Sequence, residues 1–234
     1  MSLTSLLLLA DSRLPAGAHA HSGGLEAAVA AGRVHDATGL HAFLLGRLTT
    51  VGLTAAAFAA ATVTAAQAPV DDAEWSEPGG PLAQLDAEYE ARTPSPAQRR
   101  ASRALGRQLL RAVRAGWPHP ALDAAAAVHP DGPHQPLALG AAGAASALAP
   151  RDVAVAAALG SVTGPASAAT RLLGIDPNAV TAVLAALEPV VEDVADAAAK
   201  AARGAPADLP SFSAARLDIA AEHHSTWEVR LFAS

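Results

Sequence analysis

The sequence predicts an all-α fold, and two observations support that prediction. Apolar residues recur three and four positions apart, as in Leu40, Leu44 and Leu48, which is the spacing of a buried helix face. Almost no stretch alternates apolar and polar residues in the manner of a half-buried strand. At 234 residues, the chain is long enough to bury a sizeable core. We therefore expect a single compact multi-helix domain.

The helices are placed by their start and stop signals. Ser95-Pro96 and Asp176-Pro177 each combine an N-cap side chain with proline at the first helical position, and Asp36 is a third N-cap. Gly32 suits the left-handed residue that ends a helix. Helices are expected over residues 2–10, 25–31, 37–68, 82–91, 96–116, 121–128, 134–149, 151–173 and 178–203.

Glycine and proline predict where these helices are interrupted. A break is expected near Gly46 or Gly52, and Pro165 and Pro189 are expected to kink or bend the helices that contain them. The stretch 69–81 contains Pro-Gly-Gly-Pro and is expected to be a loop.

Composition excludes several classes of function. The net charge of −6 argues against nucleic acid as a partner, since phosphate binding needs a basic face. The absence of cysteine excludes disulfides, thiolate metal sites and thiol nucleophiles, and it fits a reducing cytoplasm. No phosphate-binding loop of the Gly-x-x-x-x-Gly-Lys-Ser/Thr type is present, so nucleotide hydrolysis by this chain is not expected.

Two apolar stretches have to be tested against an alternative interpretation, a secretion signal for the first and a membrane span for the second. Residues 1–10 have an apolar centre but no preceding positive charge, and the run is short for a signal peptide. Residues 48–68 are uncharged and long enough for a membrane span, but they consist mostly of alanine and threonine. A packed N-terminal helix and a buried core helix are the preferred interpretations.

A loop near the start of the chain is rich in residues with special backbone properties. Residues 14–24 combine a proline, three glycines, two histidines and a serine, directly before a helix-like run. Glycine permits positive φ and close backbone approach, whereas proline fixes φ. The composition therefore predicts a shaped loop that leads into a helix, not a flexible spacer.

Side chains that could carry chemistry occur near both ends of the chain. His19 and His21 form one pair and the adjacent residues 223 and 224 form another, and neutral imidazole is a good ligand for nickel or zinc. Neither pair has a carboxylate or cysteine at an established ligand spacing, so loop or packing histidines are preferred. Ser22 beside His21 is a weak candidate nucleophile.

Two further groups of charged residues have alternative interpretations. Asp218 and Glu222 would lie one helical turn apart, either as an acid–base pair or, preferably, in a cation bridge to Arg216 or Arg230. Arginines recur from 99 to 114, either as a solvated face or as a docking face for an acidic partner, since guanidinium binds carboxylates bidentately.

The sequence resembles the urease accessory protein UreF family at several separate motifs. The first is Leu-Pro-x-Gly at 14–17, followed by His-Ser-x-Gly-Leu-Glu at 21–26. The tail motif comprises Leu-Asp-Ile-Ala at 217–220, His224, and Arg-Leu-Phe-x-Ser at 230–234. The segments around residues 103–110 and 167–172 also resemble motifs of this family. Departures from the family pattern at His19, Pro165, Pro177 and Ala215 resemble an actinobacterial-type branch.

This resemblance implies an all-helical protein that is not an enzyme and has no cofactor of its own. It implies assembly with UreD (also called UreH) and the GTPase UreG on apo-urease, and regulation of GTP-dependent nickel insertion. It also implies a cytoplasmic homodimer that binds neither nucleic acid nor membrane. The alternative is a helical metal-dependent enzyme that uses the histidine pairs.

The family motifs imply a set of partner-binding residues. A partner-facing loop is expected from Pro15, Gly17, His21, Ser22, Gly24 and Glu26, with Arg171 as the contact on the GTPase side. The remaining candidates are Asp218, His224, Arg230 and Phe232. They belong to a tail, residues 209–234, that follows a helical domain of residues 1–208. We expect this tail to be mobile in the isolated chain and to bind UreD.

Overall fold

The structure is a computed structural model that describes residues 3–11, 14–67, 79–212 and 214–233. Helices and turns account for the regular structure of these residues, and no strand occurs among them, so the predicted all-α class is confirmed. The α-helices are α1 (Leu3–Ala10), α2 (Leu25–Ala30), α3 (Ala37–Arg47), α4 (Leu53–Ala66), α5 (Pro81–Ala91), α6 (Pro96–Arg114), α7 (Pro120–Ala127), α8 (Gln135–Ala145), α9 (Pro150–Leu173), α10 (Pro177–Ala201) and α11 (Ala215–Ser225). The expected loop at 69–81 falls largely on residues outside this description.

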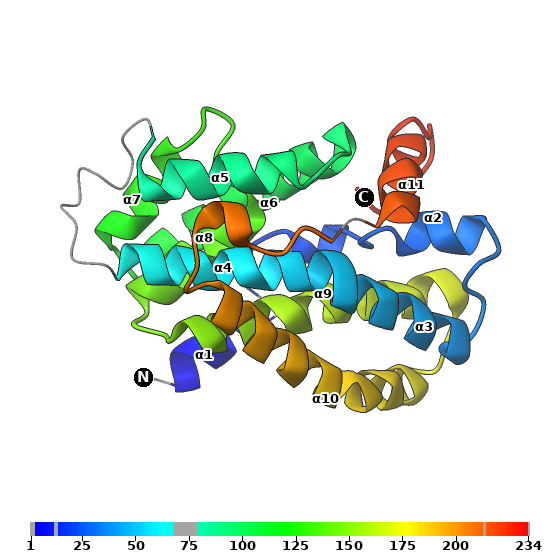
Figure 1. Ribbon diagram of the computed structural model, residues 1–234. Helices are drawn as coiled ribbons and strands as arrows, with labels where there is room; N and C mark the ends of the chain where they lie inside the picture. Colours follow the sequence, from blue (N-terminus) through cyan, green and yellow to red (C-terminus); the bar gives the residue numbers. More distant parts are fainter. Residues whose placement is uncertain (1–2, 12–13, 68–78, 213, 234) are drawn as a thin grey trace.

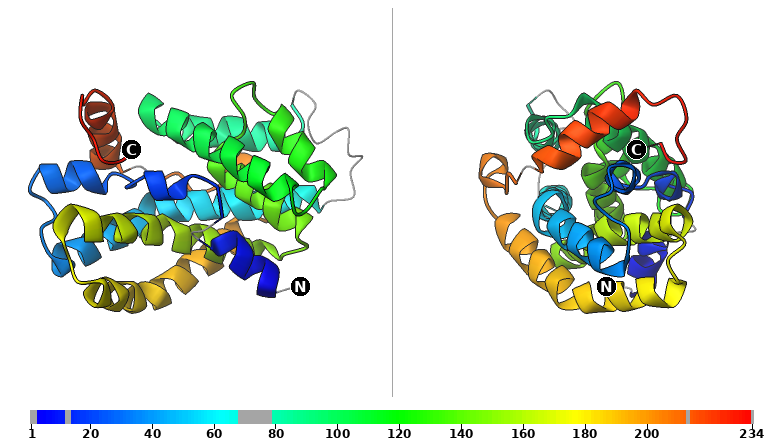
Figure 2. Two further views of the ribbon diagram at one scale, coloured as in Figure 1. Left: turned by 180° about the vertical axis from the view of Figure 1, so that it is seen from behind. Right: turned by 90° about the vertical axis from the view of Figure 1, so that its right-hand side faces the viewer.

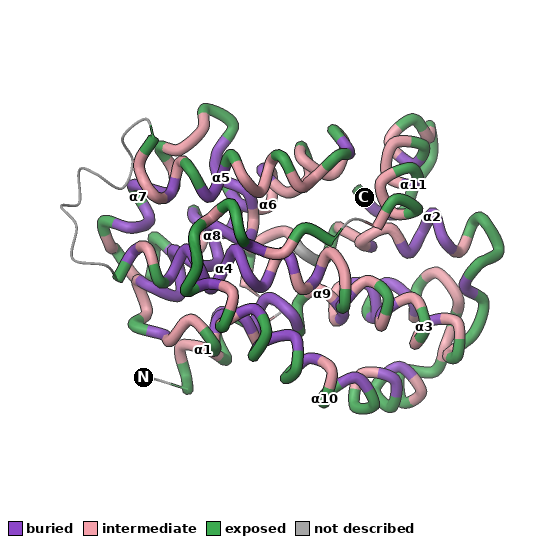
Figure 3. Tube along the Cα trace, viewed as in Figure 1, coloured by how far each residue is buried: buried purple, intermediate pink, exposed green. Residues whose placement is uncertain are grey.

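Helix α4 forms the centre of the bundle, and α8, α9 and α10 pack around it (Figure 1). Its residues are buried along nearly the whole length of the helix (Figure 3). Small residues permit this packing: a Cβ on Gly140 of α8 would lie 2.5 Å from the carbonyl oxygen of Ala59. Close helix approach through alanine and glycine therefore replaces the large aromatic side chains that this sequence mostly lacks.

Helices α3 and α4 form one rod that is joined by a π-helical turn, η2 (Leu48–Gly52). The expected break is therefore a widened turn that ends at Gly52, and the chain continues in the same direction. A Cβ on Gly52 would lie 2.8 Å from Ser161 Oγ of α9, so glycine permits the close contact there. Such turns are frequent at functional sites.

The predicted helix starts are confirmed by cap hydrogen bonds. The backbone N–H of Gln98 donates to Ser95 Oγ at 3.1 Å, and that of Asn178 donates to Asp176 Oδ1 at 3.0 Å. Asp36 Oδ1 accepts from the N–H of Gly39 at 2.7 Å. Pro165 and Pro189 lie inside α9 and α10, and both helices continue through them.

Two helical stretches are long and apolar enough to cross a membrane by length and composition alone. These are Ala37–Ala66 and Pro150–Leu173, and 61% and 50% of their most apolar windows are buried inside the protein. Core helices of soluble proteins satisfy the same criterion. Both stretches pack against other helices of the bundle here, which agrees with the preferred interpretation of buried helices.

Helix α2 and the C-terminal tail meet at one end of the bundle, whereas the N-terminal helix α1 lies away from that end (Figure 1). Helix α11 lies beside α2 in all three views, and the C-terminus lies close to both (Figures 1 and 2). Helix α11 also contacts the start of α6. The residues of the predicted tail thus pack against the helical body, while the division of the chain at residues 208 and 209 stays a prediction.

Candidate partner-binding site

The site is built around the carboxylate of Glu26, in the first turn of α2. This carboxylate accepts hydrogen bonds from the backbone N–H groups of Leu231 at 2.8 Å and Phe232 at 3.1 Å. His224 Nε2 of α11 lies 2.9 Å from Glu26 Oε2. We refer to these contacts of Glu26 as the tail anchor, because they join α2 to residues about two hundred positions later in the chain.

Glu26 remains ionised in this buried position. Burial alone would raise the pKa of its carboxyl group, but the Leu231 amide, the His224 side chain and the Phe232 amide together outweigh burial and lower it. A carboxylate only accepts hydrogen bonds, so His224 Nε2 is the donor. Hydrogen bonds to a charged group are stronger than neutral ones, which makes Glu26 the main polar contact of the tail.

His224 and Phe232, which both bind this carboxylate, have buried side chains. The ring of His224 is buried, and its centroid lies 4.7 Å from that of Trp227. Phe232 is 3% exposed, and Arg171 Cζ lies 4.7 Å from the centroid of its ring. The structure therefore brings together four predicted site residues, Glu26, Arg171, His224 and Phe232.

Arg171 also connects the tail to the N-terminal loop. Its guanidinium donates to the carbonyl oxygen of His19 at 3.2 Å, and the N–H of Ala233 donates to the carbonyl oxygen of Ala20 at 2.7 Å. The side chain remains exposed at the C-terminal end of α9. Arg171 can thus contact a partner and the tail at the same surface.

The loop before α2 has the shape that its glycines predicted. Ser22 is buried, and its Oγ accepts from the N–H of Glu26 at 3.2 Å, which fixes the start of α2. Gly24 has a φ of 90°, and a Cβ there would lie 3.1 Å from Leu217 Cδ2 of α11. Gly17 has a φ of 79°, and a Cβ there would collide with Gln108 of α6. Positive φ therefore requires glycine-like backbone freedom at both positions, whereas the neighbouring Gln108 and Leu217 side chains have flexible ends that can shift.

The remaining predicted loop and tail residues lie at the edge of this assembly. Pro15 and Arg230 are exposed, and the described residues supply no hydrogen bond or ion pair to the Arg230 side chain. His21 is half-buried, and burial together with nearby His19 lowers its pKa, which favours the neutral ring.

Asp218 and Glu222 join α11 to the N-terminus of α6. Asp218 Oδ1 accepts from Gln98 Nε2 at 3.0 Å, and Glu222 Oε1 accepts from the N–H of Ala97 at 2.7 Å and from the Ser95 hydroxyl. The preferred expectation of a cation bridge to Arg216 or Arg230 is therefore wrong. Helix N-termini attract carboxylates through their free N–H groups and dipole, and this attraction explains the difference.

Arg47 is a site residue that the sequence reading did not identify. Its guanidinium donates to the carbonyl oxygens of Gly23 at 2.8 Å and Ser161 at 3.0 Å, and burial lowers its pKa. It thereby connects α3, the N-terminal loop and α9. An isolated arginine in an otherwise apolar helix was the signal available in the sequence.

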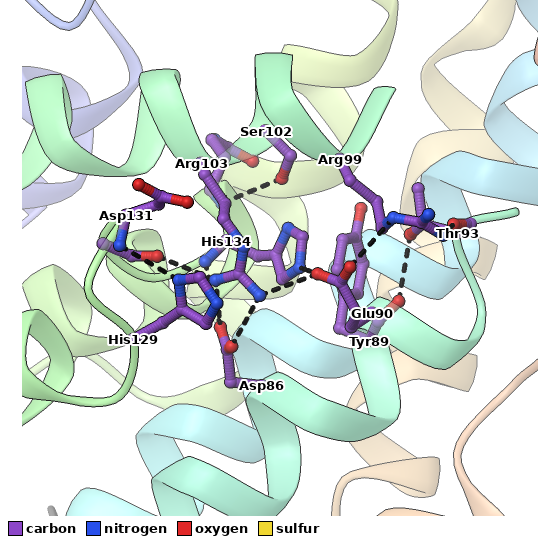
Figure 4. A network of polar contacts seen from close by, with 12 residues as sticks. Asp86, Tyr89, Glu90, Thr93, Arg99, Ser102, Arg103, His129, Asp131 and His134 are labelled. Carbon is purple, nitrogen blue, oxygen red and sulfur yellow. Dashed lines mark hydrogen bonds and ion pairs between the residues drawn. The ribbon is translucent and has the colours of Figure 1, made fainter. Parts of the chain in front are cut away.

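A second polar cluster lies among α5, α6 and the start of α8 (Figure 4). Arg103 bonds to both Asp86, at 3.0 Å, and Glu90, at 2.7 Å, and His134 Nε2 lies 2.7 Å from Glu90 Oε2. Arg103 also donates to the carbonyl oxygen of Gly132 at 2.7 Å. We call Asp86, Glu90, Arg103 and His134 the central network.

The central network fixes the protonation states of its members. Burial and the neighbouring Arg103 lower the pKa of His134, and its Nδ1 has no hydrogen-bond partner among the described residues. Burial would raise the pKa of Glu90, but His134 and Arg103 outweigh it and lower the value. Burial raises the pKa of the adjacent Tyr89 to about 12. These polar and charged side chains lie together inside the bundle, where they join α5, α6 and the start of α8.

The arginines of α6 do not form one uniform surface. Arg103 is buried in the central network, and Arg99 Nε lies 2.8 Å from Glu90. Arg100, Arg107, Arg111 and Arg114 are exposed. The interpretation as a wholly solvated face is therefore wrong for Arg103, and the acidic partners of Arg99 and Arg103 lie within this chain.

The histidine pairs do not converge on a metal-binding cluster. His224 is engaged by Glu26, while His223 Nδ1 accepts from Trp227 Nε1 at 3.3 Å. Within the described part of the chain, no three histidine, aspartate or glutamate side chains are grouped in a way that could bind a metal ion.

Comparison with known proteins decides the family. The sequence profile of the UreF family matches residues 34–188, which is more than half of the chain. A urease accessory protein UreF from Mycobacterium sp. (strain JLS) is 45% identical over 237 aligned positions, covering 100% of this chain and 99% of that protein. The chain belongs to the UreF family of urease accessory proteins.

Other UreF relatives show the same full-length similarity. The UreF proteins of Mycolicibacterium vanbaalenii and Mycobacterium tuberculosis (strain ATCC 25618 / H37Rv) are 45% and 42% identical, with 100% of this chain and 99% of each relative covered. The family profile begins after the N-terminal motif and ends before the C-terminal motif, whereas the similarity to these relatives extends over both. The relatives are named as accessory proteins and not as enzymes.

Proposed function

We propose that this UreF family member is a non-enzymatic scaffold for urease maturation. It assembles with UreD/UreH and the GTPase UreG on apo-urease, as a homodimer in the cytoplasm, and regulates GTP-dependent nickel insertion into the urease active site. Nickel is the cargo of this assembly. The loop before α2, α2 itself and the C-terminal tail provide the partner-binding surface.

The observation that supports this proposal is the contact of two distant family motifs at one buried carboxylate. Glu26 of the N-terminal motif binds His224 and the backbone of Phe232 in the C-terminal motif. Arg171, from a third motif, packs on the ring of Phe232. These buried contacts fix the tail beside the exposed Arg171, so a partner that binds Arg171 would also meet the tail.

Co-purification of the full chain with its cognate UreD and UreG tests the proposal. On a sizing column with light scattering, we expect a stoichiometric complex that contains two copies of this chain. A chain truncated after Pro210 should lose UreD, because it lacks α11 and the residues bound by Glu26. Failure of the full chain to bind either protein would contradict the proposal, and retention of UreD by the truncated chain would contradict the role of the tail.

The same experiment addresses the alternative of a metal-dependent enzyme. That alternative predicts a partner-free chain that carries tightly bound metal in stoichiometric amount. Metal analysis of the purified chain by mass spectrometry distinguishes the two cases, and we expect no stoichiometric metal.

A further inference from the structure

Helices α9 and α10 each continue through an internal proline, but the two prolines affect carbonyl groups in different surroundings. Proline has no N–H, so Pro165 and Pro189 each remove the hydrogen bond to the carbonyl oxygen four positions earlier. For Pro189 that carbonyl belongs to Ala185, which is exposed to water. For the buried Pro165 it belongs to Ser161, which is partly buried. A carbonyl group with little access to water needs a donor from within the protein.

The side chain of Arg47 supplies the donor for the Ser161 carbonyl. Its Nε–H donates to this oxygen at 3.0 Å, so an arginine of α3 replaces the backbone N–H that the proline lacks. Its Nη1 donates to the carbonyl oxygen of Gly23 at 2.8 Å. We refer to these two hydrogen bonds as the Arg47 bridge, because one guanidinium joins α9 to the loop that leads into α2.

Carbonyl oxygens, and not a carboxylate, hold the guanidinium of Arg47. Burial lowers the pKa of this group, and the described residues supply no ion pair to it. Removing a charge from water is costly unless other polar groups compensate it. The two carbonyl dipoles of the Arg47 bridge provide this compensation. The position of the guanidinium is therefore tied to both chain segments at once.

The packing of Gly23 shows that the loop lies directly against this bridge. Gly23 has a φ of 60°, and a Cβ there would lie 3.0 Å from Pro165 Cγ and 3.1 Å from Arg47 Cζ. The loop backbone therefore contacts the proline ring and the guanidinium together. Helix α2 begins two residues later, and the carboxylate of Glu26 is in its first turn. The Arg47 bridge thus lies immediately before the residue that binds the tail.

We propose that Arg47 is a positioning residue for the partner-facing loop and that it acts together with Pro165. The proline frees the carbonyl oxygen of Ser161, and Arg47 uses this oxygen as a fixed point on α9 from which it holds Gly23. The loop and the start of α2 are thereby kept in the arrangement that partners bind. This inference rests on the proposed function and identifies what holds one of its binding segments in place.

A double-mutant cycle of Arg47 and Pro165 tests this inference in the full chain. Arg47→Met, Pro165→Ala and the double variant are compared with the wild type, and Arg47→Lys is a milder change of the same side chain. Pro189→Ala is the control, because it removes a proline from inside a helix where water serves the carbonyl. Amide hydrogen exchange of Leu25 and Glu26, whose N–H groups donate within the loop, reports on its order.

We expect Arg47→Met to accelerate exchange of the loop amides about tenfold, with the amides of α4 unchanged. In the Pro165→Ala background the same change should accelerate exchange only about threefold, because the restored backbone N–H then serves the Ser161 carbonyl. Arg47→Lys keeps the charge but not the planar fork, so it should give a smaller, loop-specific acceleration. Pro189→Ala should match the wild type.

Titration with purified cognate UreD and, separately, UreG measures the functional consequence. At least one of them should bind Arg47→Met about tenfold more weakly than it binds Pro189→Ala. Unchanged affinity for both partners would overturn the inference while leaving the proposed function intact. The same holds for unchanged loop exchange in Arg47→Met, for equal acceleration in the loop and in α4, and for equal effects of Arg47→Met with and without Pro165. Absence of wild-type binding to either protein would overturn both proposals.

Discussion

The tail anchor and the central network use the same pair of side chains in different surroundings. Each contains a glutamate bonded to a buried histidine, at 2.9 Å for Glu26–His224 and 2.7 Å for Glu90–His134. In the central network a buried guanidinium, that of Arg103, neutralises the carboxylates. In the tail anchor two backbone N–H groups bind the carboxylate, and the guanidinium of Arg171 is exposed and contacts Phe232.

This difference separates a structural role from a binding role. The central network joins α5, α6 and α8 within the bundle, so its loss should affect the whole fold. The tail anchor joins α2 to the C-terminal tail at one end of the bundle, so its loss should release the tail while the bundle stays folded. Regions that bind partners are commonly less stable than the core that carries them.

Replacement of Arg103 should have the largest effect on stability. Arg103→Met leaves Asp86 and Glu90 without their buried partner, and breaking such a pair costs about 3–5 kcal/mol. Urea denaturation followed by circular dichroism measures the loss. Arg111→Met, an exposed change on the same helix, should alter the free energy of unfolding by less than about 0.5 kcal/mol. A similar, small loss for both variants would show that the central network is not structural.

Replacement of Gly24 should have an intermediate effect that is confined to the terminal region. Gly24→Ala forces a side chain into left-handed backbone, which costs about 1–2 kcal/mol, and it crowds Leu217 of α11. We expect faster proteolysis of the tail and weaker urease activation, with nearly unchanged helix content. Gly160→Ala is the control, since its Cβ would meet nothing within 4 Å in the helix interior. Unchanged tail protection in Gly24→Ala would exclude the loop from positioning α11.

Acid should affect the two regions in different pH ranges. The pKa of His134 lies below its ordinary value of 6.5, so the unfolded chain takes up this proton first and the free energy of unfolding falls as pH decreases from about 6.5. The pKa of Glu26 lies below 4.5, so its stabilisation of the tail is complete above pH 4.5 and is lost as pH falls through the folded-state pKa.

Two measurements compare these pH ranges. Urea midpoints between pH 7.5 and pH 5.5 should decrease less in His134→Gln than in the wild type. Tail amide signals in NMR spectra of the wild type should persist across the same range. If the tail signals were lost at a higher pH than the one at which the urea midpoint falls, the tail anchor, and not the central network, would be the region sensitive to mild acid.

Replacement of Arg171 should have the smallest effect on the tail. Arg171→Ala removes a cation–π contact at an exposed site, worth about 0.5–1 kcal/mol, and one hydrogen bond to His19. Tail proteolysis should accelerate only slightly, whereas assembly with UreG should weaken if Arg171 lies at the partner surface. An unchanged complex would limit Arg171 to packing on Phe232.

Much of the fold could be predicted because its signals are local. The caps at Ser95 and Asp176 and the buried positions Leu40, Leu44 and Leu48 depend on neighbours within one or two helical turns, and all of them are confirmed. A break near Gly46 or Gly52 was predicted, but its form, a π-helical turn through which the rod continues, was not.

The site was only partly predictable, because its contacts join distant positions. Glu26 and His224 were selected from separate motifs, but their contact across 198 residues is a property of the folded chain. The partners of Arg47 and the burial of Arg103 likewise depend on which helices pack together. The basic run on α6 was interpreted as a solvated face or as a docking face for an acidic partner, and the structure supplies internal carboxylates for Arg99 and Arg103.

Amide hydrogen exchange of the tail in Glu26→Gln tests the central claim most directly. The change keeps the size of the side chain but removes the charge that accepts from Leu231 and Phe232. Hydrogen bonds to charged groups contribute about 1.5–3 kcal/mol, so exchange at these two amides should accelerate about tenfold or more, with the core amides unaffected. Glu228→Gln, at an exposed tail position, should leave both rates unchanged. Equal protection of Leu231 and Phe232 in Glu26→Gln and the wild type would contradict the role of Glu26 in joining α2 to the C-terminal tail.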